Sequence, residues 1–352
     1  MKLYVIKIAN EGDRLSGVLK EALADLEVEI VDNEFAFKDL LETGKFQNAR
    51  LLFAVSLDKT GISLEAFKLL KYLSLPDCSM QGSVGGVIID GMGELYTKDL
   101  ARRITFEANL AGCTFPGKPL VEATANLSNF KVLAGLWNVD LKDAYVKACE
   151  ALADKILNFE EETVEYPSIL MIHASSRKTS NSLCLWSKVA KHLEGKSDIQ
   201  EVSIRNGEIW DCRGCKYETC VHFGENSSCF YGGVMVEKVY PAIKKCDILV
   251  LVCPNYNDAV SANIMAFINR LTSIFRTTDF SKKKIYALVV SGYSGGDIVA
   301  QQIIGAINMN KNFTLPGGFA LIETANAPGD IEKIPGIDER TREFADKILR
   351  KK

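Results

Sequence analysis

Residues 168–182 have the sequence Ser-Ile-Leu-Met-Ile-His-Ala-Ser-Ser-Arg-Lys-Thr-Ser-Asn-Ser, and a segment of helical period follows them. The opening run, residues 168–173, is apolar and of strand length, which predicts a buried strand. The remainder carries hydroxyls and cations and leads directly into the predicted helix. A buried strand, a short loop and a helix in this order predict one repeating unit of a parallel sheet with helices on its faces.

The same alternation of apolar strands and helix-period segments continues along the whole chain. In the second half we expect strands near residues 168–173, 199–203, 247–253, 284–291 and 318–323. Helices are expected between and after them, near residues 181–192, 234–244, 261–274, 297–309 and 339–351. The first half predicts strands near residues 2–8, 27–31, 51–56, 84–90 and 119–122. Each half therefore predicts a doubly wound sheet of five parallel strands.

Length and composition agree with two globular domains. The chain has 352 residues, 47% of them hydrophobic and 25% charged, and its formal charge is −3. It contains no apolar run of about 18 residues and no basic stripe for nucleic acid. Lys7 interrupts the first apolar run, which favours a strand over a signal peptide. We expect a cytoplasmic protein with domains at residues 1–160 and 166–352, joined by an acidic linker, and no membrane or nucleic-acid partner.

The two halves also repeat short strings of sequence. The segment from Pro116 to Asn126 aligns without a gap on the segment from Pro316 to Asn326, and both end in Thr-Ala-Asn. The string Ala-Asp-Lys-Ile-Leu occurs at residues 153–157 and again at 345–349. Convergent composition would explain similar hydropathy but not shared strings in the same order. We therefore expect an internal duplication.

Ligands of open α/β sheets bind beyond the carboxyl ends of the strands, so the loops after the first, third and fourth strands carry the candidate site. The first of these loops offers hydroxyls, free N–H groups and a helix N-terminus, which together favour a phosphate. An ordinary Ser/Thr/Asn helix cap is the alternative interpretation. The candidate residues of this loop are Ser175, Ser176, Arg177, Thr179, Ser180, Asn181 and Ser182.

The loops after the third and fourth strands have features that suit a planar ring. A prolyl turn with an aromatic side chain places backbone amides and a ring face beside the ligand, and glycines allow the backbone to approach it closely. The candidates after the third strand are Pro254, Asn255, Tyr256 and Asn257. Those after the fourth strand are Ser291, Gly292, Tyr293, Gly295 and Gly296.

In these motifs the second half resembles the flavodoxin-like NAD(P)H-dependent reductases that bind FMN, including the iron-sulfur flavoproteins. The resemblance extends over about residues 166–330. It departs from the family pattern at Ala174, Asn269 and Asp258, where Gly, Asp and Gly are usual. It implies two tandem flavodoxin-like domains, an FMN phosphate held by the first loop and a flavin ring held by the other two. NAD(P)H would be the donor, and the cofactor would carry the redox chemistry without a separate catalytic acid–base pair.

Between the second and third strands of this half lie Cys212, Cys215, Cys220 and Cys229. Ten cysteines in a cytosolic chain are better explained by metal or catalysis than by disulfides. Four thiolates in one segment suit a zinc ion or a [4Fe-4S] cluster. By resemblance to the iron-sulfur flavoproteins the segment implies a cluster, while zinc and structural thiols without a metal stay open.

The first half has the strands of the fold but lacks these motifs. Its first loop contains Glu11 and Asp13, and its third loop has neither the proline nor the tyrosine. We interpret it as a degenerate copy without cofactor, which substitutes for a partner subunit in a pseudo-dimer, or belongs to a homodimer. The leading function is electron transfer from NAD(P)H through FMN to a quinone, an aromatic compound or another acceptor. An electron-transfer module with ferredoxin-type partners and a flavin-free scaffold are the alternatives.

Overall fold

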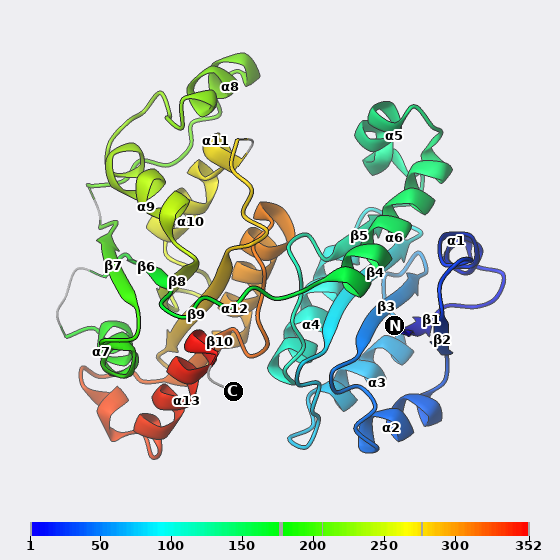
Figure 1. The fold of residues 1–352 in the computed structure, drawn as a ribbon, viewed down its shortest axis with the longest axis horizontal. Coiled ribbons are helices and arrows are strands. Elements are labelled where there is room, and N and C mark those ends of the chain that lie inside the picture. Colours follow the sequence, from blue (N-terminus) through cyan, green and yellow to red (C-terminus); the bar gives the residue numbers. More distant parts are fainter. Residues whose placement is uncertain (1, 176–178, 206, 276, 351–352) are drawn as a thin grey trace. The chain divides into compact units, whose positions relative to one another are not determined.

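A computed structural model describes residues 2–175, 179–205, 207–275 and 277–350 of the chain, which forms two compact α/β units (Figure 1). Unit 1 contains residues 1–160 and 316–318, and unit 2 contains residues 161–315 and 319–352. The expected two tandem flavodoxin-like domains are confirmed.

Unit 1 alternates strands and helices as the apolar periodicity predicts. Its strands are β1 (Leu3–Ile8), β2 (Val28–Val31), β3 (Arg50–Leu57), β4 (Val84–Gly91) and β5 (Leu120–Ala123). Its helices are α1 (Arg14–Ala22), α2 (Glu34–Glu42), α3 (Leu64–Leu73), α4 (Thr97–Leu110), α5 (Lys131–Trp137) and α6 (Leu141–Asn158), with a 3₁₀ turn at Ser128–Phe130.

Unit 2 follows the same plan with an insertion after its second strand. Its strands are β6 (Ser168–His173), β7 (Asp198–Ser203), β8 (Ile248–Pro254), β9 (Lys284–Ser291) and β10 (Ala320–Thr324). Its helices are α7 (Asn181–Leu193), α8 (Tyr217–Glu225), α9 (Tyr240–Lys245), α10 (Ala262–Arg270), α11 (Thr272–Phe275), α12 (Gly296–Ile303) and α13 (Ile337–Leu349). The helix α8 belongs to the insertion, which contains the four clustered cysteines.

Three predicted helices of unit 2 differ in detail. The one expected at residues 261–274 is two helices, α10 and α11, and α11 packs against α8. The ones expected at 234–244 and 297–309 contain the π-helical segments Met235–Val239 and Ile304–Met309. A π segment adds a residue to the turn, and an average helical period does not reveal it.

All strand pairs in both sheets are parallel, and the strand order is the same in each. The order is β2-β1-β3-β4-β5 in unit 1 and β7-β6-β8-β9-β10 in unit 2. The chain reverses direction across the sheet between the first and third strands of each unit. That switch point is where doubly wound sheets bind ligands.

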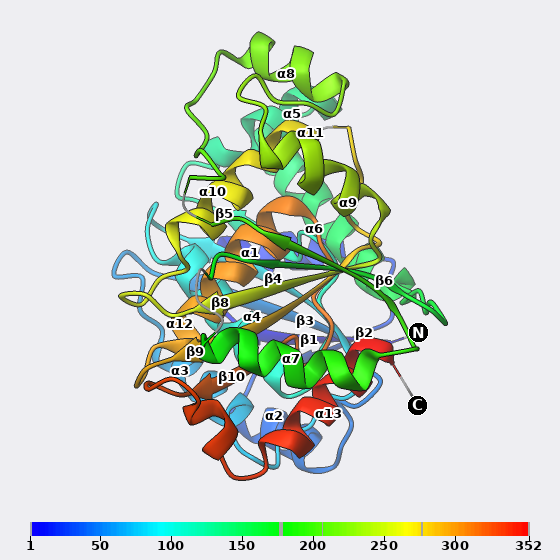
Figure 2. The ribbon, with the colours of Figure 1, turned by 90° about the vertical axis from the view of Figure 1, so that its left-hand side faces the viewer.

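Helices cover both faces of each sheet. In unit 2, α7 and α13 lie side by side on one face, and α9, α10 and α12 lie on the other (Figure 2). In unit 1, α1 and α6 pack together with side chains of β1, β3 and β4 in one apolar core. This layering leaves the strand ends and their loops as the accessible part of each sheet. Among the described residues, no helix is long and apolar enough to cross a membrane.

Candidate functional site

The loop between β6 and α7 presents hydroxyls at the start of a 13-residue helix. Ser175 is buried, and its Oγ lies 3.2 Å from Oγ of Ser180, the N-cap residue of α7. The Ser180 side chain makes no capping hydrogen bond to the helix, and Thr179 is exposed. Hydroxyls that lie beside the positive end of a helix fit a phosphate group. Ser176 and Arg177, which the sequence also assigns to this loop, lie outside the described residues.

Of the two other predicted phosphate contacts, Asn181 has hydrogen-bond partners within the protein and Ser182 is buried. Asn181 donates from Nδ2 to the carbonyl oxygen of Ala327 at 2.8 Å, and its Oδ1 accepts from the Gly329 N–H at 3.1 Å. Asn181 therefore ties the start of α7 to the loop after β10. Ser182 is 2% exposed, within the first turn of the helix.

The loop after β8 makes a tight two-residue turn. Tyr256 and Ala259 exchange backbone hydrogen bonds of 3.2 Å in both directions. Between them, Asn257 and Asp258 have φ angles of 54° and 57°. Successive left-handed residues define a type I′ turn, which Asn and Asp tolerate better than other side chains. Asp258 therefore adopts the conformation for which the family pattern uses Gly.

Asn255 joins this turn to the loop after β9. Its Nδ2 donates to the Ser294 carbonyl oxygen at 2.9 Å and to Oγ of Ser291 at 3.2 Å. Its backbone N–H donates to the Val290 carbonyl oxygen at 2.8 Å, beyond the end of β8 at Pro254. Its Oδ1 is buried and has no partner among the described residues. An unpaired buried acceptor is costly unless a ligand or water donates to it, and the flavin ring carries an N–H group.

The glycines after β9 are required by close packing. A Cβ at Gly295, whose φ is +82°, would lie 2.0 Å from Oδ1 of Asp258. A Cβ at Gly296 would lie 2.4 Å from Cγ2 of Ile322. The two loops therefore approach each other as closely as backbone permits. Two aromatic rings extend from this junction, with Tyr256 58% and Tyr293 81% exposed.

Sequence reasoning missed two residues that hold these loops. Gln302 of α12 accepts from the Val260 N–H at 3.1 Å and donates to the Asp258 carbonyl oxygen at 2.9 Å. Asn326 donates from Nδ2 to the Tyr293 hydroxyl at 2.9 Å. Gln302 carries no sequence signal within its helix. Asn326 belongs to the repeated Thr-Ala-Asn string, which was a signal of duplication and not of a role in the site.

The four clustered cysteines lie in a separate segment of unit 2. Cys212 is exposed, and Cys215, Cys220 and Cys229 are half-buried. Within the described residues, no three His, Cys, Asp or Glu side chains are grouped so that they could hold a metal ion. The residues as arranged do not fit the zinc ion or the [4Fe-4S] cluster.

Arg270 holds both ends of the cysteine segment. It is 2% exposed, and its guanidinium donates to the carbonyl oxygens of Gly232 at 2.8 Å and Trp210 at 3.4 Å. Its neighbour Asn269 donates to Oδ1 of Asp211 at 3.0 Å. Asn269 and Arg270 of α10 therefore anchor this insertion.

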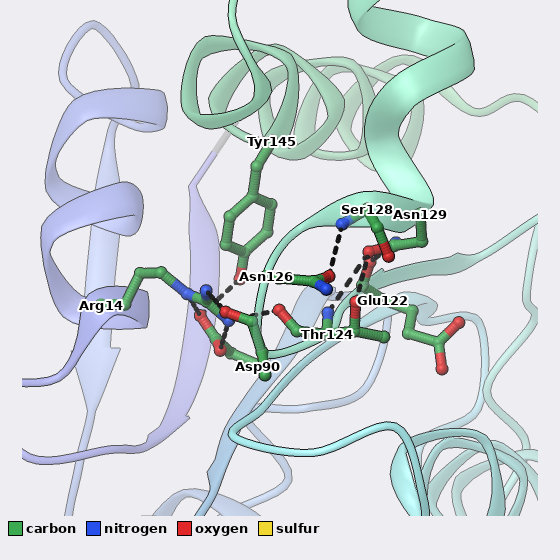
Figure 3. A network of polar contacts seen from close by, with 9 residues as sticks. Arg14, Asp90, Glu122, Thr124, Asn126, Ser128, Asn129 and Tyr145 are labelled. Atoms are coloured by element: carbon green, nitrogen blue, oxygen red, sulfur yellow. Dashed lines mark hydrogen bonds and ion pairs between the residues drawn. The ribbon is translucent and has the colours of Figure 1, made fainter.

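In unit 1 an ion pair occupies the corresponding strand ends (Figure 3). Arg14 donates to both carboxylate oxygens of Asp90, at 2.6 and 3.0 Å, and to the carbonyl oxygens of Thr124 and Ala125 at 2.9 Å. Asp90 is 4% exposed and also accepts from the Tyr145 hydroxyl at 3.3 Å. The hydrogen bond to Asp90 is the main cause that raises the pKa of Arg14. Arg14 is therefore fully engaged by the protein itself.

The strand order of unit 2, with helices on both faces of its parallel sheet, defines a flavodoxin-like α/β domain. Residues 167–327, less than half of the 352-residue chain, match the family model described as NADPH-dependent FMN reductase. This match supports an NAD(P)H-dependent flavin oxidoreductase.

Solved structures of similar fold cover about half of this chain. An NAD(P)H:quinone oxidoreductase from Methanothermobacter marburgensis is 12% identical with a TM-score of 0.41, covering 52% of this chain and 99% of its own. An FMN-dependent NADH-azoreductase from Bacillus anthracis in complex with FMN is 10% identical with a TM-score of 0.35, covering 52% and 99%. The Trp repressor binding protein from Bacillus subtilis is 18% identical with a TM-score of 0.34, covering 50% and 99%. No curated protein matches the chain.

Proposed function

We propose that unit 2 binds one FMN and transfers electrons from NAD(P)H to a quinone, an aromatic compound or another small acceptor. The observation that carries this proposal is the junction at Asn255. The Asn255 side chain joins the loops after β8 and β9 at the carboxyl ends of these strands. Its buried amide oxygen, Oδ1, is left for a donor on the ligand. The match of residues 167–327 to FMN reductases supports the same conclusion.

Different residues of unit 2 would contact the phosphate and the ring of the cofactor. Ser175, Thr179 and Ser180, with the N-terminus of α7, would hold the phosphate. The backbone of residues 254–257 and 291–296 would hold the ring, with Asn255 Oδ1 accepting a ring N–H. When bound, FMN supplies the hydride and electron chemistry. The protein orients the ring and excludes water from its buried side, and no acid–base pair is required.

We also propose that unit 1 is a copy of the fold that takes no FMN. Near the end of β4, Asp90 forms an ion pair with Arg14. Asp13 is the N-cap residue of α1, whereas the corresponding N-cap residue of α7 in unit 2 is Ser180. Asp13 opposes a phosphate dianion by like charge, and Arg14, which Asp90 engages, has no free charge to offer it. One flavin per chain is the expected stoichiometry.

The electron-transfer alternative requires a cluster on the cysteine segment. Since the described side chains do not fit a metal there, no step of the proposed reaction passes through it. Iron and acid-labile sulfide analysis of protein purified without oxygen tests this alternative separately from the flavin.

The proposed function is tested by the visible spectrum, the flavin content and the reduction rate. Protein purified without oxygen should contain about one FMN per chain, and NADPH or NADH should bleach it rapidly. A colourless protein that does not take up FMN would refute the proposal. Bound flavin that ferredoxin reduces quickly and nicotinamides reduce slowly would favour the electron-transfer module.

A further inference from the structure

Unit 1 contains a cavity of about 400 Å³ at the carboxyl ends of β1, β2 and β3. Its floor is apolar, since it includes Ile6, Val31, Phe37 and Leu69, each only 3% or 4% exposed. Residues of α2 and α3, two helices that pack against each other, form its walls (Figure 1). A cavity of this size with an apolar floor and a few polar groups is typical of a small-molecule site, and doubly wound sheets bind their ligands at this end.

The cavity is open because the second strand of unit 1 is short. β2 has 4 residues, whereas β7, its counterpart in unit 2, has 6. As a result, β1 pairs with β3 through Ile8 but with β2 only through Ile6, while β6 pairs with β7 up to its last residue, His173. Within the described part of the chain, no backbone partner is found for the N–H of Ala9, which follows β1 and lines the cavity. An unpaired donor of this kind is available to a ligand.

Asp32 stands where the longer strand continues in unit 2. Counted from the residue opposite the start of β1 or β6, it corresponds to Val202, which is 3% exposed. Asp32 is exposed, and its Oδ1 accepts from Asn33 Nδ2 at 3.2 Å. Asn33 is itself fixed as the N-cap of α2, where its Oδ1 accepts from the Ala36 N–H at 2.9 Å. Since no cation of the described structure pairs with Asp32, its oriented carboxylate can accept hydrogen bonds from a ligand.

Tyr72 of α3 gives the cavity an aromatic wall. The centroid of its ring lies 6.3 Å from that of Phe37. Its hydroxyl donates to Oε1 of Glu34 at 2.6 Å, and Glu34 forms an ion pair with Lys68 at 3.2 Å. A planar group can pack against this wall, and a ring already held in position loses little entropy when it does so.

The charge of the lining favours hydroxyl groups over a phosphate. Four acidic residues, among them Asp13 and Asp32, and only two lysines line the cavity. Carboxylates accept hydrogen bonds from hydroxyls but repel a phosphate. In doubly wound sheets, an acidic residue that follows the second strand is placed to accept from the hydroxyls of a ribose.

We propose that this cavity of unit 1 binds a ribonucleoside that carries no phosphate group. The ribose hydroxyls donate to Asp32, and the base packs against Phe37 and Tyr72. The Ala9 N–H supplies a donor for an oxygen or nitrogen atom of the same ligand. The site lies within unit 1 and does not depend on flavin binding by unit 2.

The test is calorimetric titration of the full chain with adenosine and with uridine, which represent the two kinds of base. At least one of them should fill one site per chain with a dissociation constant below about 1 mM. Its 2′-deoxy form should bind about tenfold more weakly, because a hydroxyl that donates to a carboxylate is lost. Its 5′-monophosphate should also bind more weakly, because the cavity carries excess negative charge.

The decisive variant is Asp32→Asn, which keeps the shape of the side chain and removes its charge. It should raise the dissociation constant of the nucleoside about tenfold and narrow the difference between the ribo and deoxy forms, which a merely structural role would not do. The matched control is Asp39→Asn, an exposed aspartate of α2 outside the cavity, which should change neither quantity. Tyr72→Ala should weaken binding about tenfold, and Tyr72→Phe, which keeps the ring, less than about threefold.

Three results would overturn the inference. They are no binding of either nucleoside below about 1 mM, tighter binding of the monophosphate than of the nucleoside, and an unchanged affinity in Asp32→Asn. Protein stripped of FMN should bind the nucleoside with the same affinity, and a loss of binding there would place the ligand in unit 2. A parent protein that takes up no FMN but binds the nucleoside would refute the proposed function and leave this inference standing.

Discussion

The two units have the same strand order and differ at the loop that follows the first strand. In unit 2 the described part of this loop offers the hydroxyls of Ser175 and Ser180, and the Ser180 side chain makes no capping bond to α7. In unit 1 the loop, residues 9–13, is shorter and acidic, and the Asn10 N–H donates to the Asp13 carboxylate at 3.0 Å. A shared fold therefore does not imply a shared site, because the site depends on loops that the sheet tolerates in either form.

The first residue of the first helix makes the comparison sharper. Arg14 and Asn181 both begin their helices, and both donate to a carbonyl oxygen of the loop after the fifth strand. Arg14 also binds Asp90, the seventh residue of β4, whereas the seventh residue of β9 is Val290. The structural role is kept in both units, and unit 1 adds a buried carboxylate near the end of β4, where β9 has Val290.

The largest effect is expected when the N-cap residues of α7 and α1 are exchanged. Ser180→Asp would place a carboxylate beside the phosphate, and like charges about 4 Å apart repel by about 4 kcal/mol at an effective dielectric constant near 20. We expect the FMN dissociation constant to rise at least about 100-fold, measured by flavin fluorescence titration.

The matched exchange in unit 1 is Asp13→Ser. It should leave the flavin content at one per chain, because Asp90 still occupies Arg14. Tight FMN binding by Ser180→Asp would break the comparison, since it would mean that the phosphate lies elsewhere.

The second effect is on stability and concerns unit 1. Asp90→Asn leaves Arg14 without its carboxylate, and breaking such a pair costs about 3 kcal/mol. The free energy of unfolding should fall by about that amount in urea, with the flavin content unchanged. The control is Glu42→Gln in the exposed pair Lys38–Glu42, which should cost less than about 0.5 kcal/mol. A loss of FMN in Asp90→Asn would show that unit 1 is not independent of the cofactor.

The strands and the strand-end loops could be predicted from the sequence because their signals are local. Buried parallel strands are continuous apolar runs, and β6 and β9 begin and end where those runs do. Loop composition likewise indicated a turn after β8. The glycines after β9 were expected to let the backbone approach a ligand, and in the structure Gly295 lies against Asp258.

The contacts that join distant loops were not predictable, because they pair residues far apart in sequence. Asn255 meets Ser294, Asn326 meets Tyr293, and Arg14 meets Asp90 only after the sheet has formed. Spacing within a single segment does not contain such information. The cysteine segment shows the converse, since four thiols near one another in sequence are not gathered as a metal site in the described structure.

A smaller effect on FMN binding is expected at Asn255, which joins the loops after β8 and β9. Asn255→Ala removes the hydrogen bonds to Ser291 and Ser294 and the unpaired Oδ1, so the loops lose their connection. We expect the FMN dissociation constant to rise about tenfold, as for a loss of about 1.4 kcal/mol. Asn257→Gly is the control, because glycine adopts the observed φ of 54° without strain. Equal effects of the two changes would show that the turn, and not the Asn255 side chain, matters for binding.

The smallest effect is a pH dependence that unit 2 has and unit 1 lacks at the same place. The first strand ends in His173 in unit 2 and in Ile8 in unit 1. Burial is the main cause that lowers the pKa of His173 below its ordinary 6.5, with Arg205 acting in the same direction and Glu201 opposing it. Its Nδ1 is buried without a partner among the described residues.

The folded protein therefore binds fewer protons at His173 than the unfolded chain does. The stabilising effect of the neutral imidazole is present above about pH 6.5 and is lost as the pH falls from there through the lowered folded-state pKa. Hydrogen exchange of β6 should accordingly become faster as the pH falls below about 6.5, after correction for intrinsic rates, while exchange of β1 should not. His173→Gln should remove this dependence without a change in FMN content. The same acid-induced loss of protection in His173→Gln would assign the pH dependence to other groups of unit 2 and remove His173 from the comparison.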